Sequence, residues 1–409
     1  MLKKQALNGL KVVEFGMAIV GPLLTKWLAA CGATVVRIES EKKIDILRVA
    51  SPYAKGVPGI NRAIYYIYND GKYSLGLNLD KPQGIEIAKK LVAWADVVVE
   101  NFAANTLDKW GLGYDELKRI RNNIIVVRAS AYGQTGPYSK QKGFGGQLAA
   151  LAGLTHLIGW PGRGPVGSPN AYTDFVAAWY GIIATMSALS YRQRTGKGVY
   201  IDLSQVESGV TVITPAMLDY MVNQRIQNAA GNRCAYAAPH GAYRCRGDDR
   251  WCVIAVFGEE DWAAFCKAIG RPAWVSDSKF GTAVARKRNE DELDRLVEQW
   301  TVQHTAEEIT EVMQQAGVAA GTVKSAEDLF NDPQLKHRSH FWPLEHPEMG
   351  TVSYEAPSFR LSATPIEINQ GAPLFAEHTE YVCKHLLGIS DEEFDRLLIS
   401  DAVSLPVQS

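Results

Sequence analysis

The carboxylate of Asp174 stands at the start of a long apolar run, Phe175–Leu189, which closes with Arg192, Arg194 and Gly196. Basic residues in the last turn and a glycine just past it are typical of a helix C-terminus. We therefore expect Asp174 near a helix N-terminus, where backbone N–H groups and the helix dipole would keep it ionised. An ionised carboxylate backed by an apolar core can act as a nucleophile. The competing interpretation is that Asp174 only caps the helix, as most aspartates at helix starts do.

The composition excludes several classes of protein. The 409 residues are enough for two domains, and 46% apolar and 21% charged residues are ordinary for a globular chain. A formal net charge of −1 argues against a nucleic-acid or membrane-surface protein, although it permits a local basic site for a phosphorylated ligand. The six cysteines form no CxxC pair, which indicates reduced thiols and a cytoplasmic location. Lys11 and Glu14 interrupt the apolar N-terminal stretch, so we predict no signal peptide and no membrane span.

Apolar strands alternate with amphipathic helices in the first half of the chain. We expect strands over Leu10–Phe15, Thr34–Ile38, 96–100, Ile124–Ala129 and Val199–Leu203, and helices over Leu23–Ala30, Gln83–Trp94, Tyr114–Arg121 and the run after Asp174. This alternation predicts an α/β fold with a doubly wound, Rossmann-like parallel sheet covered on both faces.

The character of the sequence changes near residue 225. Short strands near 242–243 and 251–257 are followed by helices, one of them opened by the capping box Thr305-x-x-Glu308. We therefore predict a large α/β domain over 1–224, a smaller α+β domain over 225–330, and a C-terminal segment, 331–409, that returns to the large domain.

Two glycine patterns imitate a dinucleotide fingerprint but do not predict one. Gly16 and Gly21 lack the GxGxxG spacing, whereas Gly162, Gly164 and Gly167 have it in a proline-rich loop with no flanking strand or helix. Histidines at 337, 340 and 346 lack a ligand spacing, so we expect surface histidines and no metal.

Lysines and aromatic residues recur in the loops that follow the predicted strands. They are Lys81, Asn101, Phe102, Lys109, Trp110 and Lys142. Because the loops after parallel strands line the ligand crevice, lysines there can hold phosphates, and Phe102 or Trp110 can stack on a purine. Their shared placement favours a nucleotide-like ligand over isolated surface residues.

Ordered sequence blocks point to a known family. They include Leu10-Lys-Val-Val-Glu-Phe, Gly32-Ala-Thr-Val-Val-Arg-Ile-Glu39, Leu77-Asn-Leu-Asp80, Val99-Glu-Asn-Phe102, Gly133-Gln-Thr-Gly-Pro-Tyr138, Tyr172-Thr-Asp174, Gly317-Val-Ala-Ala-Gly321 and Ala372-Pro-Leu-Phe-Ala-Glu-His378. With these blocks the chain resembles, nearly end to end, the family III CoA transferases, the group that includes formyl-CoA transferase and carnitine CoA-transferase.

The resemblance implies a role for several positions. Asp174 falls on the catalytic aspartate of the family, and Ala18 and Ile19 fall on the loop that faces the thioester. The CoA-contacting positions implied are Leu77, Asn101, Phe102, Lys109 and Lys142, with Lys81 beside one of them. The glycine-rich flap of the family corresponds to His240 and Gly241, and Tyr172, Trp160, Arg163 and His240 are candidates for the acyl pocket.

The implied reaction is CoA transfer between two acids through a mixed anhydride and an aspartyl-CoA thioester, with CoA as part of the substrate and no permanent cofactor. An α-methylacyl-CoA racemase is an alternative, but the second acid/base group of that class would fall on Phe144 or Gly145, which cannot supply one. A CoA-binding subunit of a hetero-oligomer is the non-catalytic alternative, and Asp174 favours a working enzyme.

The resemblance leaves the substrates and the assembly open. Likeness to the subunits of benzylsuccinate CoA-transferase implies a dicarboxylic or aromatic acid such as benzylsuccinate, with succinyl-CoA as donor. Arg163 could hold a second carboxylate, or it could be a solvated loop residue. An interlocked dimer is implied, formed either by two copies or with a paralogous subunit.

Overall fold

The computed structural model describes residues 5–168 and 170–406. By its internal packing the chain divides into two compact units. The first comprises residues 1–155, 167–226 and 336–409, and the second comprises residues 156–166 and 227–335. Each unit has a hydrophobic core of its own.

The first unit is built on a seven-stranded sheet. Its strands are β1 (Lys11–Phe15), β2 (Thr34–Glu39), β3 (Tyr73–Leu77), β4 (Val97–Glu100), β5 (Ile125–Ser130), β6 (Tyr200–Ser204) and β12 (Val403–Ser404). The strand order is β12-β3-β2-β1-β4-β5-β6, and every pair is parallel except β12 with β3. The order 3-2-1-4-5-6 of the parallel strands is that of the doubly wound dinucleotide-binding folds, which confirms the predicted fold class at this level.

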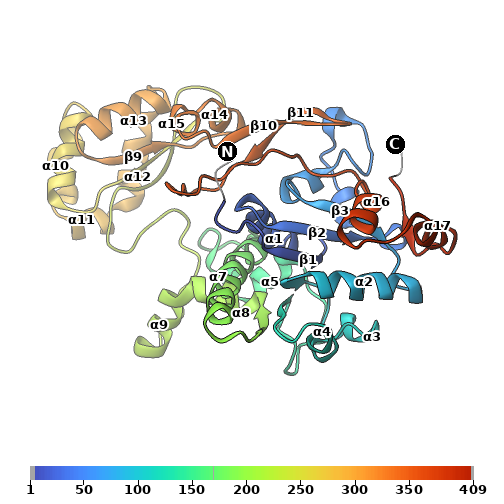
Figure 1. Cartoon of the computed structure of the whole chain (residues 1–409). Helices are drawn as coiled ribbons and strands as arrows, with labels where there is room; N and C mark the ends of the chain where they lie inside the picture. The colour runs from blue at the N-terminus through green and yellow to red at the C-terminus, as the bar shows by residue number, and fades with distance from the viewer. Residues whose placement is uncertain (1–4, 169, 407–409) are drawn as a thin grey trace. The chain divides into compact units, whose positions relative to one another are not determined.

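Helices cover both faces of this sheet (Figure 1). The helices of this part of the chain are α1 (Val20–Ala30), α2 (Pro82–Trp94), α3 (Thr106–Lys109), α4 (Tyr114–Ile120), α5 (Gly145–Leu151), α7 (Tyr172–Thr195), α8 (Gln205–Val210), α9 (Thr214–Asn223), α16 (Thr379–Tyr381) and α17 (Asp391–Ile399). Short elements at its borders are α6 (Leu154–Leu157), α15 (Pro333–His337) and the hairpin β10 (Phe341–His346) with β11 (Gly350–Glu355).

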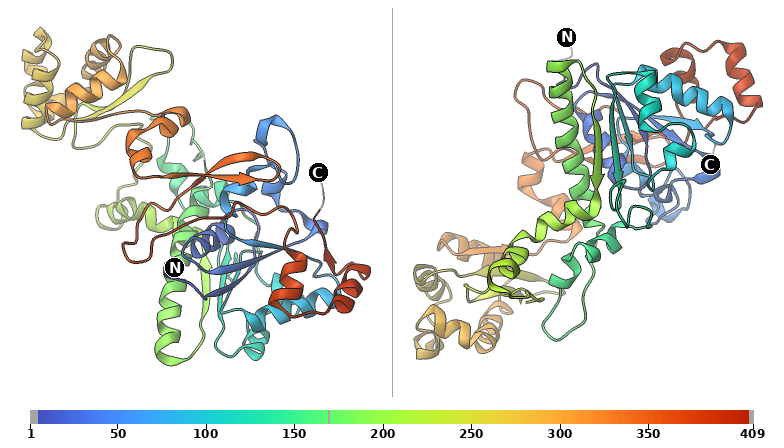
Figure 2. Two further views of the ribbon diagram at one scale, coloured as in Figure 1. Left: turned by 45° about the horizontal axis from the view of Figure 1, so that its top comes forward. Right: turned by 90° about the horizontal axis from the view of Figure 1, so that it is seen from below.

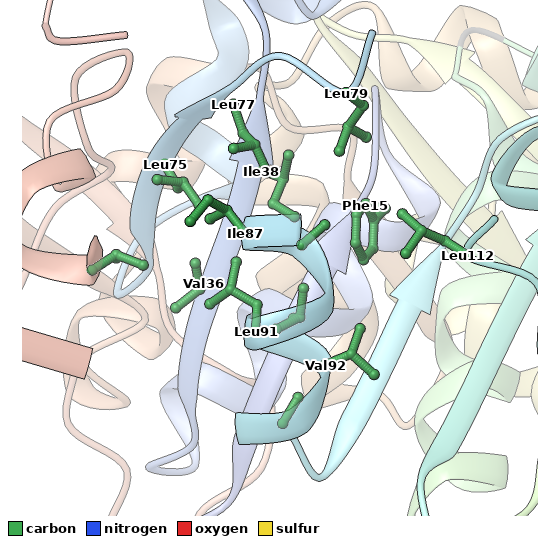
Figure 3. Packing of buried hydrophobic residues seen from close by; sticks show 14 of the residues in the cluster. Phe15, Val36, Ile38, Leu75, Leu77, Leu79, Ile87, Leu91, Val92 and Leu112 are labelled. Carbon is green, nitrogen blue, oxygen red and sulfur yellow. The ribbon is translucent and has the colours of Figure 1, made fainter. Parts of the chain in front are cut away.

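Alternate residues of the strands feed two separate cores. Val13, Val36, Val382 and Leu91 of α2 are fully buried in one core, and Figure 3 shows part of it, with Val36 on its strand and Leu91 on α2. Val12 and the other alternate positions face α1 and α7, which lie together on the opposite face (Figure 2). Both faces are therefore dry, as the apolar strands predict.

Strand β3 was not predicted from the sequence, and its composition explains why. Ser74 and Gly76 weaken the strand signal of the segment Tyr73–Leu77. Both residues are required by their contacts, because the Ser74 hydroxyl donates to Glu39 over 2.6 Å and a Cβ at Gly76 would lie 2.4 Å from the Ser404 hydroxyl oxygen.

The second unit contains a three-stranded antiparallel sheet, β7 (His240–Arg244), β8 (Trp251–Ala255) and β9 (Ala319–Thr322). Its helices are α10 (Glu259–Ala268), α11 (Ala283–Arg288), α12 (Glu290–Thr301), α13 (Ala306–Gln315) and α14 (Ala326–Asn331). The predicted capping box is present, since Thr305 accepts from the Glu308 N–H and Glu308 accepts from the Thr305 N–H.

Two further expectations meet the structure. His346 is buried, and its Nδ1 accepts from the backbone N–H groups of Glu348 and Met349, so the prediction of a surface histidine is wrong there. Within the described ranges, no helix combines the length and apolar sequence that a membrane span requires.

A buried ionic cluster joins the first three strands. Arg37 on β2 lies opposite Glu14 on β1 and donates to it over 2.7 Å, while Lys72 donates to the other Glu14 oxygen over 2.9 Å. Burial alone would raise the pKa of Glu14, but the charges of Lys72 and Arg37 lower it below its ordinary value. Arg37 also donates to Asp45 and to the Gly16 carbonyl, so one guanidinium ties the strands to the loop after β1.

We expect Arg37→Met to destabilise the fold by about 3–5 kcal/mol, because it removes one of the two cations of the buried Glu14 and leaves the buried Asp45 carboxylate without the cation that it accepts from. Denaturant unfolding measures the change. Arg119→Met, which removes an exposed pair with Glu116, is the control and should cost less than about 1 kcal/mol. Equal effects in the two variants would contradict the structural role of the cluster.

Candidate active site

A cavity of about 490 Å³ opens at the carboxyl ends of β1, β2, β3 and β4. The sheet order reverses between β1 and β4, and open α/β sheets bind ligands in the crevice at this switch point. The residues that line the cavity are Phe15, Gly16, Met17, Arg37, Ile38, Glu39, Ser40, Lys42, Lys43, Asp45, Leu77, Asn78, Leu79, Asp80, Phe102, Thr106, Lys109 and Trp110.

The cavity brings together three of the predicted contact residues, Leu77, Phe102 and Lys109. Phe102 meets Trp110 edge to face, with ring centroids 6.1 Å apart, so two aromatic rings in contact form part of the cavity lining. Lys81 and Lys142 are not among the lining residues.

Lys42 and Lys43 line the same cavity and were missed from the sequence. They follow β2, so the rule that placed lysines after the other strands would have found them. Together with Lys109 they give the cavity three ammonium groups, which can hold phosphates as point charges.

Asn101 shapes the loop after β1. Its Oδ1 accepts from the Met17 N–H over 2.8 Å, and its Nδ2 donates to the Met17 carbonyl over 2.7 Å. The next residue, Ala18, has a φ of +58°, and its N–H donates to Asp45 over 3.0 Å. Ala18 and Ile19 are therefore held in one conformation at the entrance to α1.

Asp174 lies in the first turn of α7, on the same edge of the sheet. Ala177, one turn further along, packs with Val20 at the start of α1 and Ala129 at the end of β5. The carboxylate of Asp174 therefore lies near the carboxyl ends of the strands, where the loop of Ala18 also lies.

The structure excludes the capping interpretation of Asp174 and corrects the expectation about its ionisation. Ala171, not Asp174, is the N-cap residue of α7, and no side chain caps the helix. The Asp174 side chain is buried, and its Oδ1 has no hydrogen-bond partner among the described residues. Burial raises the pKa of Asp174 to about 7, so the helix N-terminus does not keep it fully ionised at neutral pH.

Gly145 provides the space beside this carboxylate. A Cβ at Gly145 would lie 2.8 Å from the Asp174 Oδ1 and 2.3 Å from the Ala171 Cβ. Thr173 also donates to the Gly145 carbonyl over 3.1 Å, which fixes α5 against α7. The position next to Asp174 is therefore occupied by a residue with no side chain.

The remaining predicted residues lie elsewhere. His240 and Gly241 begin β7 and line a cavity of about 410 Å³ in the second unit together with Trp160 and Arg163. The His240 ring contacts the Asn232 carbonyl through Nδ1 over 2.7 Å. Tyr172 is an exposed residue of the first unit, at the start of α7.

Metal-binding clusters are not part of the described site: no group of three or more His, Cys, Asp or Glu side chains in residues 5–168 and 170–406 could hold an ion. All six cysteines are free.

The chain thus has an α/β fold, a basic and aromatic cavity at the switch point of its sheet, and a buried aspartate on the same edge. Its sequence also matches a known protein family. The family model for CoA-transferase family III covers residues 7–379. The chain belongs to this family, and it is a CoA-transferase.

Relatives and solved structures agree with this assignment. The chain is 30% identical over 393 residues to succinyl-CoA–D-citramalate CoA-transferase of Chloroflexus aurantiacus, covering 96% of each protein. It is 31% identical over 396 residues to the beta subunit of succinyl-CoA–L-malate CoA-transferase of the same organism, again covering 96% of each. The crystal structure of a CAIB/BAIF family protein from Brucella suis superposes with a TM-score of 0.86 at 29% identity, covering 94% of this chain and 100% of that one.

The raised pKa of Asp174 predicts a pH-dependent stability. Its pKa in the folded chain, about 7, exceeds the ordinary value of 3.8, so the folded state binds more protons than the unfolded state between these values. The contribution of the Asp174 carboxyl to the free energy of unfolding is therefore fully present below about pH 4 and is lost as the pH rises through about 7. Relative to Asp174→Asn, the wild type should be less stable at about pH 8 than at about pH 5, as measured by denaturant unfolding. A difference that stays constant, or that grows in the opposite direction, contradicts the buried carboxyl.

Proposed function

We propose that this chain moves CoA from an acyl-CoA donor to a carboxylic acid acceptor through covalent intermediates on Asp174. The observation that carries the proposal is the environment of Asp174, a buried carboxylate whose Oδ1 accepts no hydrogen bond from the described residues. A carboxylate without hydrogen bonds keeps its full nucleophilicity once ionised, and a pKa of about 7 leaves a large ionised fraction at neutral pH.

The chemistry proceeds by oxygen and sulfur exchange. An Asp174 oxygen attacks the donor thioester carbon and the carbon–sulfur bond breaks. CoA thiolate is the leaving group, and a mixed anhydride between Asp174 and the donor acid forms. The thiolate attacks the Asp174 carbonyl of the anhydride, which releases the donor acid and leaves an aspartyl-CoA thioester. The acceptor carboxylate attacks this thioester, its carbon–sulfur bond breaks, and CoA thiolate departs as a second anhydride forms. The thiolate then attacks the acceptor carbonyl of this anhydride, and the Asp174 carboxylate is the leaving group. The product is the acceptor thioester, and Asp174 is regenerated.

The cavity at the switch point supplies the CoA site in this proposal. Lys42, Lys43 and Lys109 bind the phosphates, and Phe102 with Trp110 stacks on the adenine. The resemblance to family members adds Lys81, Lys142 and Leu77 as CoA contacts and Ala18 with Ile19 beside the thioester. The resemblance also adds Asn101 as a CoA contact, and the side chain of Asn101 holds the Met17 backbone as well.

The racemase alternative is disfavoured by Gly145. A racemase needs two acid/base groups that flank the α-carbon of the acyl group. Gly145 lies directly beside Asp174 and has no side chain, and a Cβ there would already crowd the Asp174 Oδ1. The site therefore offers a nucleophile without the second acid/base group at this position.

The acids are proposed to be dicarboxylic. The two relatives above are named for succinyl-CoA as donor and for citramalate or malate, both dicarboxylic, as acceptor. Arg163, with His240 and Gly241 in the same cavity of the second unit, is a candidate for the second carboxylate. Benzylsuccinate, which is both dicarboxylic and aromatic, fits the same class, and Tyr172 remains a candidate for the acyl pocket.

An oligomer is the proposed working form. Helices α7 and α9 expose large apolar side chains that a monomer in water would bury, namely Trp179, Tyr180, Ile183, Met186, Met217, Leu218, Met221 and Val222. These exposed side chains support a dimer, which family resemblance implies to be interlocked. The division into domains over 1–224, 225–330 and 331–409 stays a prediction from the sequence. One relative is the beta subunit of its enzyme, so pairing with a paralogous chain is the alternative.

We expect Asp174→Ala and Asp174→Asn to fold and bind acyl-CoA but to lose CoA transfer by several orders of magnitude, as follows removal of a nucleophile. The Asn variant keeps the shape of the side chain and removes the charge. The measurement is the rate of CoA transfer from succinyl-CoA to a panel of mono- and dicarboxylic acids.

Trapping completes this test. Wild type incubated with donor and then with hydroxylamine or borohydride should carry its modification on the peptide that contains Asp174. Normal transfer by the Asn variant, or an adduct that maps to another residue under turnover, would refute the proposed mechanism.

Lys109→Ala should raise the KM for the acyl-CoA substrate with a smaller change in kcat, because phosphate binding is uniform along the reaction. Lys142→Ala should act in the same direction if the contact implied by family resemblance holds. Lys118→Ala on α4, outside the cavity lining, is the matched control. An unchanged KM in both the Lys109 and the Lys142 variants defeats the CoA assignment.

A further inference from the structure

Tyr68 packs against Phe175, the residue that directly follows Asp174 in α7. It is the last residue of the short 3₁₀ helix Ile64–Tyr68, and its ring meets the ring of Phe175 edge to face, with centroids 6.2 Å apart. Tyr68 also packs in the same apolar clusters as Ile19, so it stands between the loop after β1 and the first turn of α7.

The hydroxyl of Tyr68 has no hydrogen-bond acceptor among the described residues. The side chain is half-buried, and no residue in the described part of the chain accepts a hydrogen bond from it. Burial, then the charges of Glu355 and Asp174, raise the pKa of Tyr68 to about 12. The hydroxyl therefore stays protonated at physiological pH, and it lies within electrostatic reach of the Asp174 carboxylate.

We propose that the Tyr68 hydroxyl donates a hydrogen bond to the carbonyl oxygen of the acyl group that reacts with Asp174. When an Asp174 oxygen attacks the thioester carbon, negative charge develops on that carbonyl oxygen, and it returns to the carbon as the CoA thiolate leaves. Tyr68 keeps its proton throughout and stabilises the charged oxygen. A fixed donor aimed at a developing oxyanion, in a site that excludes water, accelerates such steps strongly.

Tyr66 supplies a matched control two residues away. It is half-buried in the same 3₁₀ helix, and its ring meets Tyr354 edge to face with centroids 5.5 Å apart. Burial and the charge of Glu355 raise its pKa, but Asp174 is not among the causes, in contrast to Tyr68. Removing the two hydroxyls separately therefore compares a donor near Asp174 with a similar one that lies away from it.

The experiment uses the full chain with Tyr68→Phe and Tyr66→Phe, both of which keep the ring packing. We expect Tyr68→Phe to lower kcat for transfer from succinyl-CoA by about tenfold or more, with a KM for succinyl-CoA that changes by less than about twofold, since single oxyanion donors contribute about a hundredfold in other enzymes. Tyr66→Phe should leave both parameters within about twofold of the wild type. Thermal unfolding of the two variants reports any general loss of structure.

An unchanged kcat in Tyr68→Phe overturns the inference, and so does an equal loss in both variants, which would indicate packing. A change confined to KM overturns it as well, because a transition-state donor acts on kcat. The inference rests on the proposed function, and the two fail separately. Absence of transfer in the wild type, or normal transfer in Asp174→Asn, refutes the proposed function. Normal wild-type transfer with an unaffected Tyr68→Phe refutes only the role of Tyr68.

Discussion

The buried ion pair between Glu14 and Arg37 is the constraint on which the rest of the first unit depends. The two residues are opposite each other in β1 and β2, at the centre of the sheet, and neither side chain reaches solvent. Such a pair stabilises a fold only when every partner is present. Here Lys72 forms a second ion pair with Glu14, and Asp45 forms a second ion pair with Arg37. The network therefore fixes the register of the central strands at their carboxyl ends, where the candidate site residues follow.

The same network reaches the loop after β1, beside the candidate site, through one carboxylate. Asp45 accepts from Arg37 with one side-chain oxygen, and that oxygen also accepts from the Ala18 N–H. Asn101, at the end of β4, holds the preceding residue, Met17, from the other side. The loop that opens α1 is thus clamped between two strands. Asp174 lies in the first turn of α7, on the same edge of the sheet, and burial raises its pKa.

Periodicity and turn signals were enough to predict most of the sheet and the course of α7, because apolar strands and a glycine such as Gly196 carry local information. They could not predict β3, where Ser74 and Gly76 serve long-range contacts. The site was predictable in part: position after a strand placed Phe102 and Lys109 in one cavity, and the family resemblance added Leu77. Tertiary packing determines the neighbours of Asp174, its high pKa and the pairing of Asn101 with Met17. Local sequence patterns do not predict such contacts.

The proposed covalent role of Asp174 has a direct isotopic test. In the proposed exchange, the bridging oxygen of the second anhydride comes from the acceptor acid and remains on Asp174 when the acceptor thioester is released. Wild-type enzyme that turns over an acceptor acid labelled with a heavy oxygen isotope in its carboxylate should therefore carry the label in the Asp174 peptide, as measured by mass spectrometry after proteolysis. Turnover that leaves the Asp174 peptide unlabelled would contradict the account, because CoA would then have moved without an anhydride at this residue.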